Sequence, residues 1–232
     1  MKMVTLAGAH ACGKTAVILK TAGLLKAQGL VCGAVKSDCL YSDEEQAYTA
    51  AGIKHRKLLA GNVCPDHHFA SALLDIFAWG REERLDVLFT ESAGLCGRCA
   101  PHIRSVAAVC VIDCLSGISA PKKAGPMLRC ADHIVVTKGD LVSPVEREVF
   151  LFHVQAANPR ARISFINGLT GQGAWKLASF LLSQPDTEKL EGRHLRYTMP
   201  SAQCSFCAGQ TVLTPSTPGG RIKDAYGEEA LL

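Results

Sequence analysis

The sequence lacks several features that would place the protein in a membrane, outside the cell or on nucleic acid. No apolar stretch reaches the roughly 18 residues that a membrane helix requires. Lys14 and Lys20 interrupt the apolar N-terminal region, so we expect no secretory signal peptide. The formal net charge is only +4 and no block of lysine or arginine stands out. We therefore expect a cytoplasmic protein with neither a membrane nor a nucleic acid as partner.

Cysteine, by contrast, is plentiful. The chain has 232 residues, of which 48% are apolar, and this is enough for one α/β domain with a full core, or one domain with an appendage. Eleven cysteines are many for a chain without an export signal. In a reducing compartment such thiols are metal ligands or buried apolar residues more often than disulfides.

Apolar runs alternate with helical patterns along most of the chain, and no internal repeat is present. Helices are expected over residues 14–27 and 66–80, and from Ser42, which stands in capping-box spacing with Glu45. Further helical stretches separate the last three strands. This order predicts an α/β fold with a doubly wound, mostly parallel sheet. The expected strands are residues 2–7, 30–37, 56–62, 86–92, 106–113, 133–140 and 161–167.

The first expected strand leads into GAHACGKT, residues 8–15, which satisfies the phosphate-loop (P-loop) pattern G-x-x-x-x-G-K-[ST]. Gly8 and Gly13 allow the backbone to turn its amides toward phosphates, Lys14 reaches the β- and γ-phosphates, and Thr15 ligates Mg²⁺. The remaining loop residues complete the cradle, and the Cys12 thiol is expected to be exposed when the site is empty. The pattern predicts binding of a nucleoside triphosphate with Mg²⁺. Those remaining residues are Ala9, His10, Ala11 and Cys12.

A second motif, VVTKGDL, predicts which base is bound. It places Thr137, Lys138 and Asp140 directly after an apolar strand. A carboxylate there can accept hydrogen bonds from N1 and the 2-amino group of guanine, a bidentate contact that adenine cannot offer. The alkyl stem of Lys138 can lie along the base plane. We therefore expect GTP rather than ATP.

The order of these motifs resembles the CobW/HypB/UreG family of SIMIBI-class P-loop GTPases, the nickel-delivery GTPases of urease and hydrogenase maturation. The resemblance covers residues 3–182 and also includes KSDCLYSDEEQAY, GNVCPDHHF, FTESAGLCGRCAP, VIDCLSGISAPKKAGPML and LTGQG. It implies a GTP-hydrolysing homodimer that carries a transition metal between its subunits. By position, Asp38 would lie in the first switch and Glu91 at the magnesium and water side, acting with Lys14 in catalysis. A carboxylate at a strand's carboxyl end beside the P-loop suits that role.

The resemblance also implies a metal site, at which this sequence departs from the family pattern. Cys64 and His67 lie in VCPDH, where the family has histidine directly after cysteine and proline. Three residues apart at a helix start, the two side chains can still face the same way. A thiolate with an imidazole suits nickel or zinc.

A second candidate metal site is Cys96 and Cys99 in GLCGRCAPH, with His102 close behind. The C-x-x-C spacing lets both sulfurs point to one ion. A two-fold dimer would then bring four thiolates together, which suits zinc or an iron–sulfur cluster better than square-planar nickel. The family typically has a single cysteine here, so the identity of the metal is open. Two buried thiols in a turn are the alternative.

The helical and strand patterns fade after Gln184. Residues 185–232 contain several prolines and no sustained apolar pattern, which is typical of a loosely packed segment. We expect a P-loop GTPase domain at residues 1–184 and an irregular tail at residues 185–232. The tail carries a further pair, Cys204 and Cys207, for which metal capture is the first interpretation. Completing a cluster and redox chemistry are alternatives.

The leading hypothesis is a GTPase metallochaperone that assists metallocentre assembly in a client metalloenzyme, directly or through accessory proteins. One alternative is an NTPase whose dimer-bridging iron–sulfur cluster passes electrons in a redox activation. The other is a metal-responsive GTP-binding regulator that presents a surface to a partner. Thr137, Lys138 and Asp140 argue for GTP and therefore for the first and third hypotheses.

Overall fold

The computed structural model describes residues 1–38, 45–61, 65–94, 101–197 and 213. Its centre is a seven-stranded sheet with the strand order β3-β2-β4-β1-β5-β6-β7, and every neighbouring pair is parallel. The predicted doubly wound α/β sheet is therefore confirmed. The strands are β1 (Lys2–Ala7), β2 (Cys32–Asp38), β3 (Lys54–Leu59), β4 (Val87–Glu91), β5 (Ala107–Asp113), β6 (His133–Thr137) and β7 (Arg162–Phe165).

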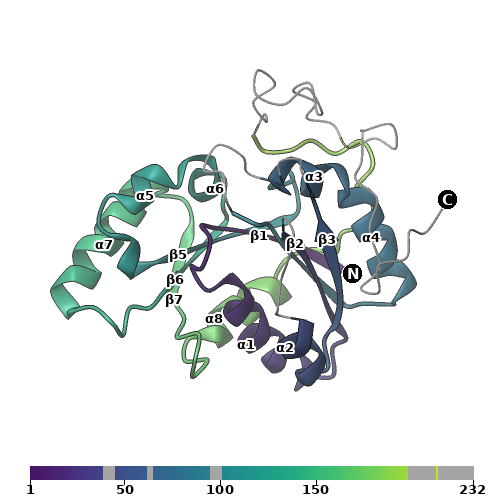
Figure 1. The fold of residues 1–232 in the computed structure, drawn as a ribbon, viewed down its shortest axis with the longest axis horizontal. Helices are drawn as coiled ribbons and strands as arrows, with labels where there is room; N and C mark the ends of the chain where they lie inside the picture. The colour runs from purple at the N-terminus through teal and green to yellow at the C-terminus, as the bar shows by residue number, and fades with distance from the viewer. Residues whose placement is uncertain (39–44, 62–64, 95–100, 198–212, 214–232) are drawn as a thin grey trace.

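Helices cover both faces of this sheet (Figure 1). Helices α1, α2 and α8 pack on one face, and α3 to α7 pack on the other. The helices are α1 (Lys14–Lys26), α2 (Glu45–Ala50), α3 (Pro65–Ser71), α4 (Leu73–Glu82), α5 (Ala120–Lys123), α6 (Gly125–Arg129), α7 (Pro144–Ala157) and α8 (Ala174–Leu182), with a 3₁₀ turn at Cys114–Ser116. No helix in the described part of the chain is both long and apolar enough to cross a membrane.

The alternation of side chains along each strand explains the two-sided core. In β1, Val4 and Leu6 are buried with α1 and α8, whereas Met3 is buried with α3 and α4 on the opposite face. The same alternation continues in β4, where Phe89 faces α1 and Leu88 faces α4. Buried strands of this kind place their carboxyl ends at one edge of the sheet, where ligands of doubly wound folds bind.

Two predicted elements differ from the structure. The apolar pattern of residues 66–80 predicts one helix, but the chain forms α3 and α4, because Ala72 between them leaves the helical conformation (φ −87°, ψ 1°). The strand predicted at residues 56–62 begins earlier, at Lys54, and ends at Leu59. This strand is at the edge of the sheet, so its burial pattern is less regular than that of its neighbours.

The start of the predicted loose tail is in fact packed on the domain. Leu190, Leu195 and Leu213 are buried in the core cluster beneath α3 and α4. The Arg196 guanidinium binds both carboxylate oxygens of Asp132, at 2.6 and 2.7 Å. Loose packing is therefore wrong for residues 185–197. The remaining tail, with Cys204 and Cys207, lies outside the described residues apart from Leu213, and the division at residue 184 stays a prediction.

Candidate nucleotide site

The P-loop connects β1 to α1 and packs closely against strand β5. A Cβ atom on Gly8 would lie 2.2 Å from the Val111 carbonyl oxygen, so only glycine fits there. Gly13 caps α1 in the left-handed conformation, with φ 95°. The amino end of α1 consequently faces the carboxyl edge of the sheet, the orientation that favours phosphate.

The Cys12 thiol was expected to be exposed, and this expectation is wrong. Its side chain is fully buried in the core, and burial raises the pKa of the thiol to about 11. Cys12 can therefore contribute to a phosphate cradle only through its backbone. His10 and Ala11, by contrast, are exposed at the tip of the loop.

The predicted magnesium residues lie together at the buried end of the site. The Thr15 hydroxyl donates to both oxygens of Glu91, at 3.1 and 3.0 Å. Because its hydrogen is directed at Glu91, the Thr15 oxygen keeps lone pairs for a cation, and this arrangement fits Mg²⁺. Lys14 is also buried, and its ammonium donates to the carbonyls of Gly8 and Ala9, at 3.1 and 2.9 Å.

Sequence reasoning missed two further residues at this position. The Tyr48 hydroxyl on α2 donates to Glu91 Oε2 at 3.1 Å, and the Lys36 ammonium on β2 lies 3.9 Å from Glu91 Oε1. Lys36 also lies 3.9 Å from Asp38 Oδ2. Lys36 precedes Asp38 by two residues, so strand alternation could have placed both on one face. Tyr48 carries no comparable signal, because its contact depends on how α2 packs.

These groups line a cavity of about 280 Å³, which we call the phosphate cavity. Burial raises the pKa of Glu91, while the charges of Lys36 and Lys14 and the hydrogen bonds from Thr15 and Tyr48 lower it. The net direction is upward, so the environment makes the ionised carboxylate costly. A cation that entered this cavity would favour ionisation of Glu91. The lining residues used below are His10, Lys14, Thr15, Lys36, Asp38 and Glu91.

The predicted base residues lie at the other end of the P-loop. The Thr137 hydroxyl donates to the Cys12 carbonyl at 2.6 Å, and the Lys138 ammonium donates to the Ala11 carbonyl at 2.9 Å. Lys138 also lies 3.6 Å from Asp113 Oδ1. The structure thus brings the TKGD segment directly onto the P-loop, as a joint nucleotide site requires.

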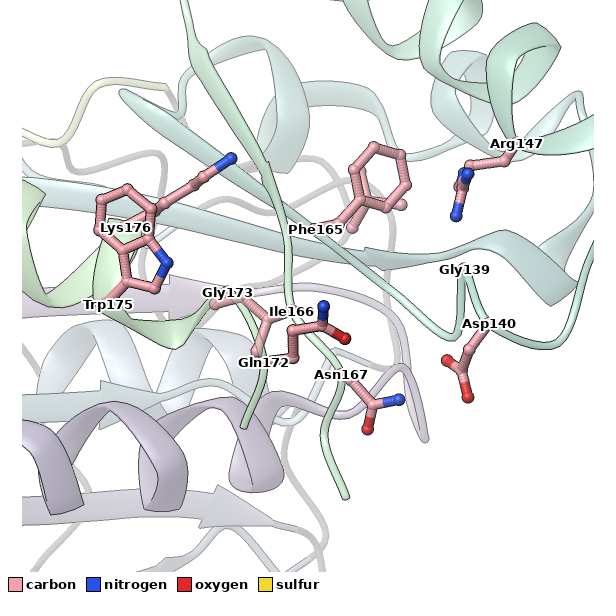
Figure 2. A pocket seen from close by; sticks show the side chains of 11 residues that line it. Gly139, Asp140, Arg147, Phe165, Ile166, Asn167, Gln172, Gly173, Trp175 and Lys176 are labelled. Atoms are coloured by element: carbon pink, nitrogen blue, oxygen red, sulfur yellow. The ribbon is translucent and has the colours of Figure 1, made fainter. Parts of the chain in front are cut away.

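Asp140 is exposed and lines a cavity of about 360 Å³, which we call the base cavity. Figure 2 shows Asp140 and Asn167 on one side of this cavity and Trp175 and Lys176 on the other. The Arg147 guanidinium lies 5.7 Å from the Phe165 ring in the same wall. Asn167 uses its side-chain oxygen to accept from the backbone of Leu169 and Thr170, which shapes the loop after β7.

The candidate metal ligands cannot be placed in the same detail. Cys64, Cys96 and Cys99 lie outside the described residues, and His67 belongs to α3 but its side chain is not described. His102 is buried and both ring nitrogens have partners, the Thr5 hydroxyl at 2.8 Å and the Met127 carbonyl at 3.1 Å. Burial lowers the pKa of His102 to about 4, so it is a neutral core histidine. In the described part of the chain, no three His, Cys, Asp or Glu side chains gather to hold a metal.

The parallel sheet, the P-loop and its threonine–carboxylate contact define a P-loop nucleoside triphosphatase fold. Residues 2–165 match the CobW/HypB/UreG nucleotide-binding domain, so the chain belongs to this family.

The relatives found by sequence agree with this assignment. An uncharacterized protein from Methanocaldococcus jannaschii is 40% identical over 227 residues, which are 98% of this chain and 97% of the relative. The urease accessory protein UreG from Haloquadratum walsbyi is 29% identical over 188 residues, covering 73% and 89% of the two chains.

Solved structures share the fold. HypB, a hydrogenase maturation factor from Archaeoglobus fulgidus, superposes with a TM-score of 0.63 at 23% identity, covering 78% of this chain and 89% of that one. HypB from Helicobacter pylori, in complex with nickel, gives 0.63 at 18% identity, with coverage of 82% and 92%. The cell division protein FtsY from Thermotoga maritima gives 0.55 at 16% identity, with coverage of 79% and 69%, as expected for the SIMIBI class.

Proposed function

We propose that this protein is a GTP-hydrolysing metallochaperone that binds a transition metal between the two subunits of a homodimer. The observation that carries this proposal is the course of one strand. Strand β4 ends in Glu91, which holds the Thr15 hydroxyl, and the chain then continues to Gly94. A Cβ atom on Gly94 would lie 1.8 Å from the Gly8 carbonyl oxygen, so this segment packs directly on the P-loop. Cys96 and Cys99 follow within five residues.

Hydrolysis would use the phosphate cavity. Lys14 would bind the β- and γ-phosphates, Thr15 would hold Mg²⁺, and Asp38 and Glu91 would act on the magnesium and water side. Bound Mg²⁺ would neutralise charge on the phosphates. Glu91 is suited to orient the attacking water because its carboxylate is already held by Thr15 and Tyr48.

Asp140 supports GTP as the nucleotide. It is exposed at the base cavity, while the neighbouring Lys138 and Thr137 are bonded to the P-loop backbone. A guanine in the base cavity could therefore reach the Asp140 carboxylate while its phosphates lie on the P-loop. The curated relatives named UreG are consistent with a role in metallocentre assembly.

The metal is cargo, and its ligands are proposed from the sequence. Two copies of Cys96 and Cys99 would give four thiolates on the two-fold axis, with Cys64 and His67 as the competing site. Nickel is supported by a fold relative that is solved with nickel, whereas four thiolates favour zinc or an iron–sulfur cluster. GTP would favour the closed dimer, and hydrolysis would release the ion to a client enzyme or its accessory proteins in the cytoplasm. Cys204 and Cys207 would capture metal first.

The test is metal content against nucleotide state. We expect the anaerobically purified protein to hold one ion per two chains with Mg²⁺ and a non-hydrolysable GTP analogue, and less with GDP. Because linkage is reciprocal, the metal should tighten GTP-analogue binding by the same factor. Cys96→Ala with Cys99→Ala should abolish metal-dependent dimerisation and preserve GTP binding. Cys130→Ala, at a half-buried cysteine on the far side of β5, is the matched control.

Other results would change the proposal. Loss of metal in Cys64→Ala alone would move the site to that residue. One ion per chain, unaffected by nucleotide, would remove the shared site. A brown protein with visible absorption would favour the iron–sulfur NTPase, and slow hydrolysis insensitive to every metal would favour a GTP-binding regulator.

A further inference from the structure

Lys36 is a second lysine in the phosphate cavity, and neither the P-loop pattern nor the metal proposal assigns it a role. It lies near the carboxyl end of β2, where its register partner in β4 is Glu91. Its side chain is only 12% exposed. The cavity therefore has a lysine on each of two separate elements, Lys14 from the P-loop and Lys36 from the sheet.

The distances leave Lys36 available to a further group. Its ammonium lies 3.9 Å from both Asp38 Oδ2 and Glu91 Oε1, about 1 Å longer than a charge-assisted hydrogen bond. Two carboxylates thus hold the ammonium in the cavity by charge without closing around it. Both carboxylates are also proposed to face Mg²⁺, which would draw them away from Lys36 and leave the ammonium to an anion.

We propose that Lys36 contacts the γ-phosphoryl group and stabilises the charge that develops on it during hydrolysis. This inference rests on the proposed nucleotide hydrolysis. In that step a water oxygen forms a bond to the γ-phosphorus, and the bond from phosphorus to the β–γ bridging oxygen breaks. The nucleoside diphosphate leaves with the bonding electron pair, and the water's proton ends on the released phosphate or on solvent. A cation beside the equatorial oxygens accelerates this reaction, as arginine fingers do when supplied in cis or in trans.

A structural alternative must be separated from this role, since Lys36 could merely be the counter-ion of buried Glu91. A counter-ion would affect all nucleotide states alike, or the stability of the fold. A cation on the γ-phosphoryl group affects the transition state above all. The readout is therefore the ratio of two affinities, for GDP with Mg²⁺ and aluminium fluoride, which mimics the planar transition state, and for GDP with Mg²⁺ alone.

In Lys36→Met we expect this ratio to fall roughly a hundred- to a thousandfold, with kcat falling in parallel and GDP affinity little changed. Lys36→Arg should recover part of both. The matched control is Lys57→Met. Lys57 is the register partner of Lys36 on β3, is 15% exposed and pairs with Glu45 at 3.1 Å, but does not line the cavity. It should leave the ratio unchanged.

Each outcome decides the matter. An unchanged ratio in Lys36→Met, or an equal loss of GDP and transition-state analogue affinity, overturns the role of Lys36 and leaves the proposed function intact. A wild-type protein that binds no nucleotide overturns both. If the wild type binds ADP with aluminium fluoride instead, the guanine assignment fails and the same ratio, measured with ADP, tests Lys36.

Discussion

The two ends of the nucleotide site differ in how completely the protein has built them. At the phosphate end, Lys14 and Glu91 are buried and Thr15 is bonded to Glu91. At the base end, Asp140 is exposed and only its neighbours are bonded to the P-loop. The difference indicates that phosphate binding is organised in advance and common to all nucleotides. Discrimination among bases would then depend on one exposed carboxylate.

The largest effect should come from Lys14→Ala. Two charged phosphate contacts are worth about 1.5–3 kcal/mol each, so nucleotide affinity should fall by at least about a hundredfold, for GTP and ATP alike. Titration calorimetry with both nucleotides measures this. Lys54→Ala is the control, because Lys54 pairs with Glu83 at the surface of β3. Full GTP affinity and hydrolysis in Lys14→Ala would refute the assignment of the P-loop.

Glu91→Gln should separate binding from hydrolysis. We expect kcat to fall at least about a hundredfold if Glu91 acts on the water, while affinity for the GTP analogue changes little. The same variant should be more stable than the wild type at neutral pH, because burial raises the pKa of Glu91. The wild type should lose stability relative to the variant as pH rises above about 4.3, the unfolded value for glutamate.

Denaturant unfolding between pH 4 and pH 8, in the absence of nucleotide and Mg²⁺, measures this difference. A variant less stable than the wild type at neutral pH would show that the partners of Glu91 outweigh its burial. Unchanged kcat would remove Glu91 from the reaction.

The parts of the fold and site that could be predicted are those set by local sequence. The P-loop and Lys14 follow from glycine spacing between a strand and a helix, and the parallel sheet follows from the alternation of elements. The parts that were missed depend on distant contacts. The Thr187 amide donates to the Met1 carbonyl, and Leu195 bridges to Ile103, so the proline-rich composition of the tail did not indicate its packing. Tyr48 reaches Glu91 only because α2 packs beside β4.

Asp140→Asn tests the base end. Loss of one charge-assisted contact should weaken GTP binding by about 1.5–3 kcal/mol, roughly ten- to a hundredfold, and leave ATP binding unchanged. Competition between the two nucleotides for a fluorescent analogue measures the ratio. Equal weakening of both would show that Asp140 does not read the base. Equal affinity of the wild type for ATP and GTP would contradict guanine recognition altogether.

The smallest effect should come from Thr137→Val, which acts on the link between the two ends. Thr137 is buried and its hydroxyl donates to the Cys12 carbonyl at 2.6 Å, while valine keeps its shape and its preference for a strand. One such bond is worth about 0.5–1.5 kcal/mol. Because it orders the P-loop backbone, its loss should weaken GTP, GDP and ATP equally, by about two- to tenfold. Thr90→Val is the matched control, since Thr90 is also buried and donates to the Val4 carbonyl at 3.0 Å. Both variants should lose similar stability, but only Thr137→Val should weaken nucleotide binding. A loss confined to GTP would place Thr137 at the base instead of on the P-loop.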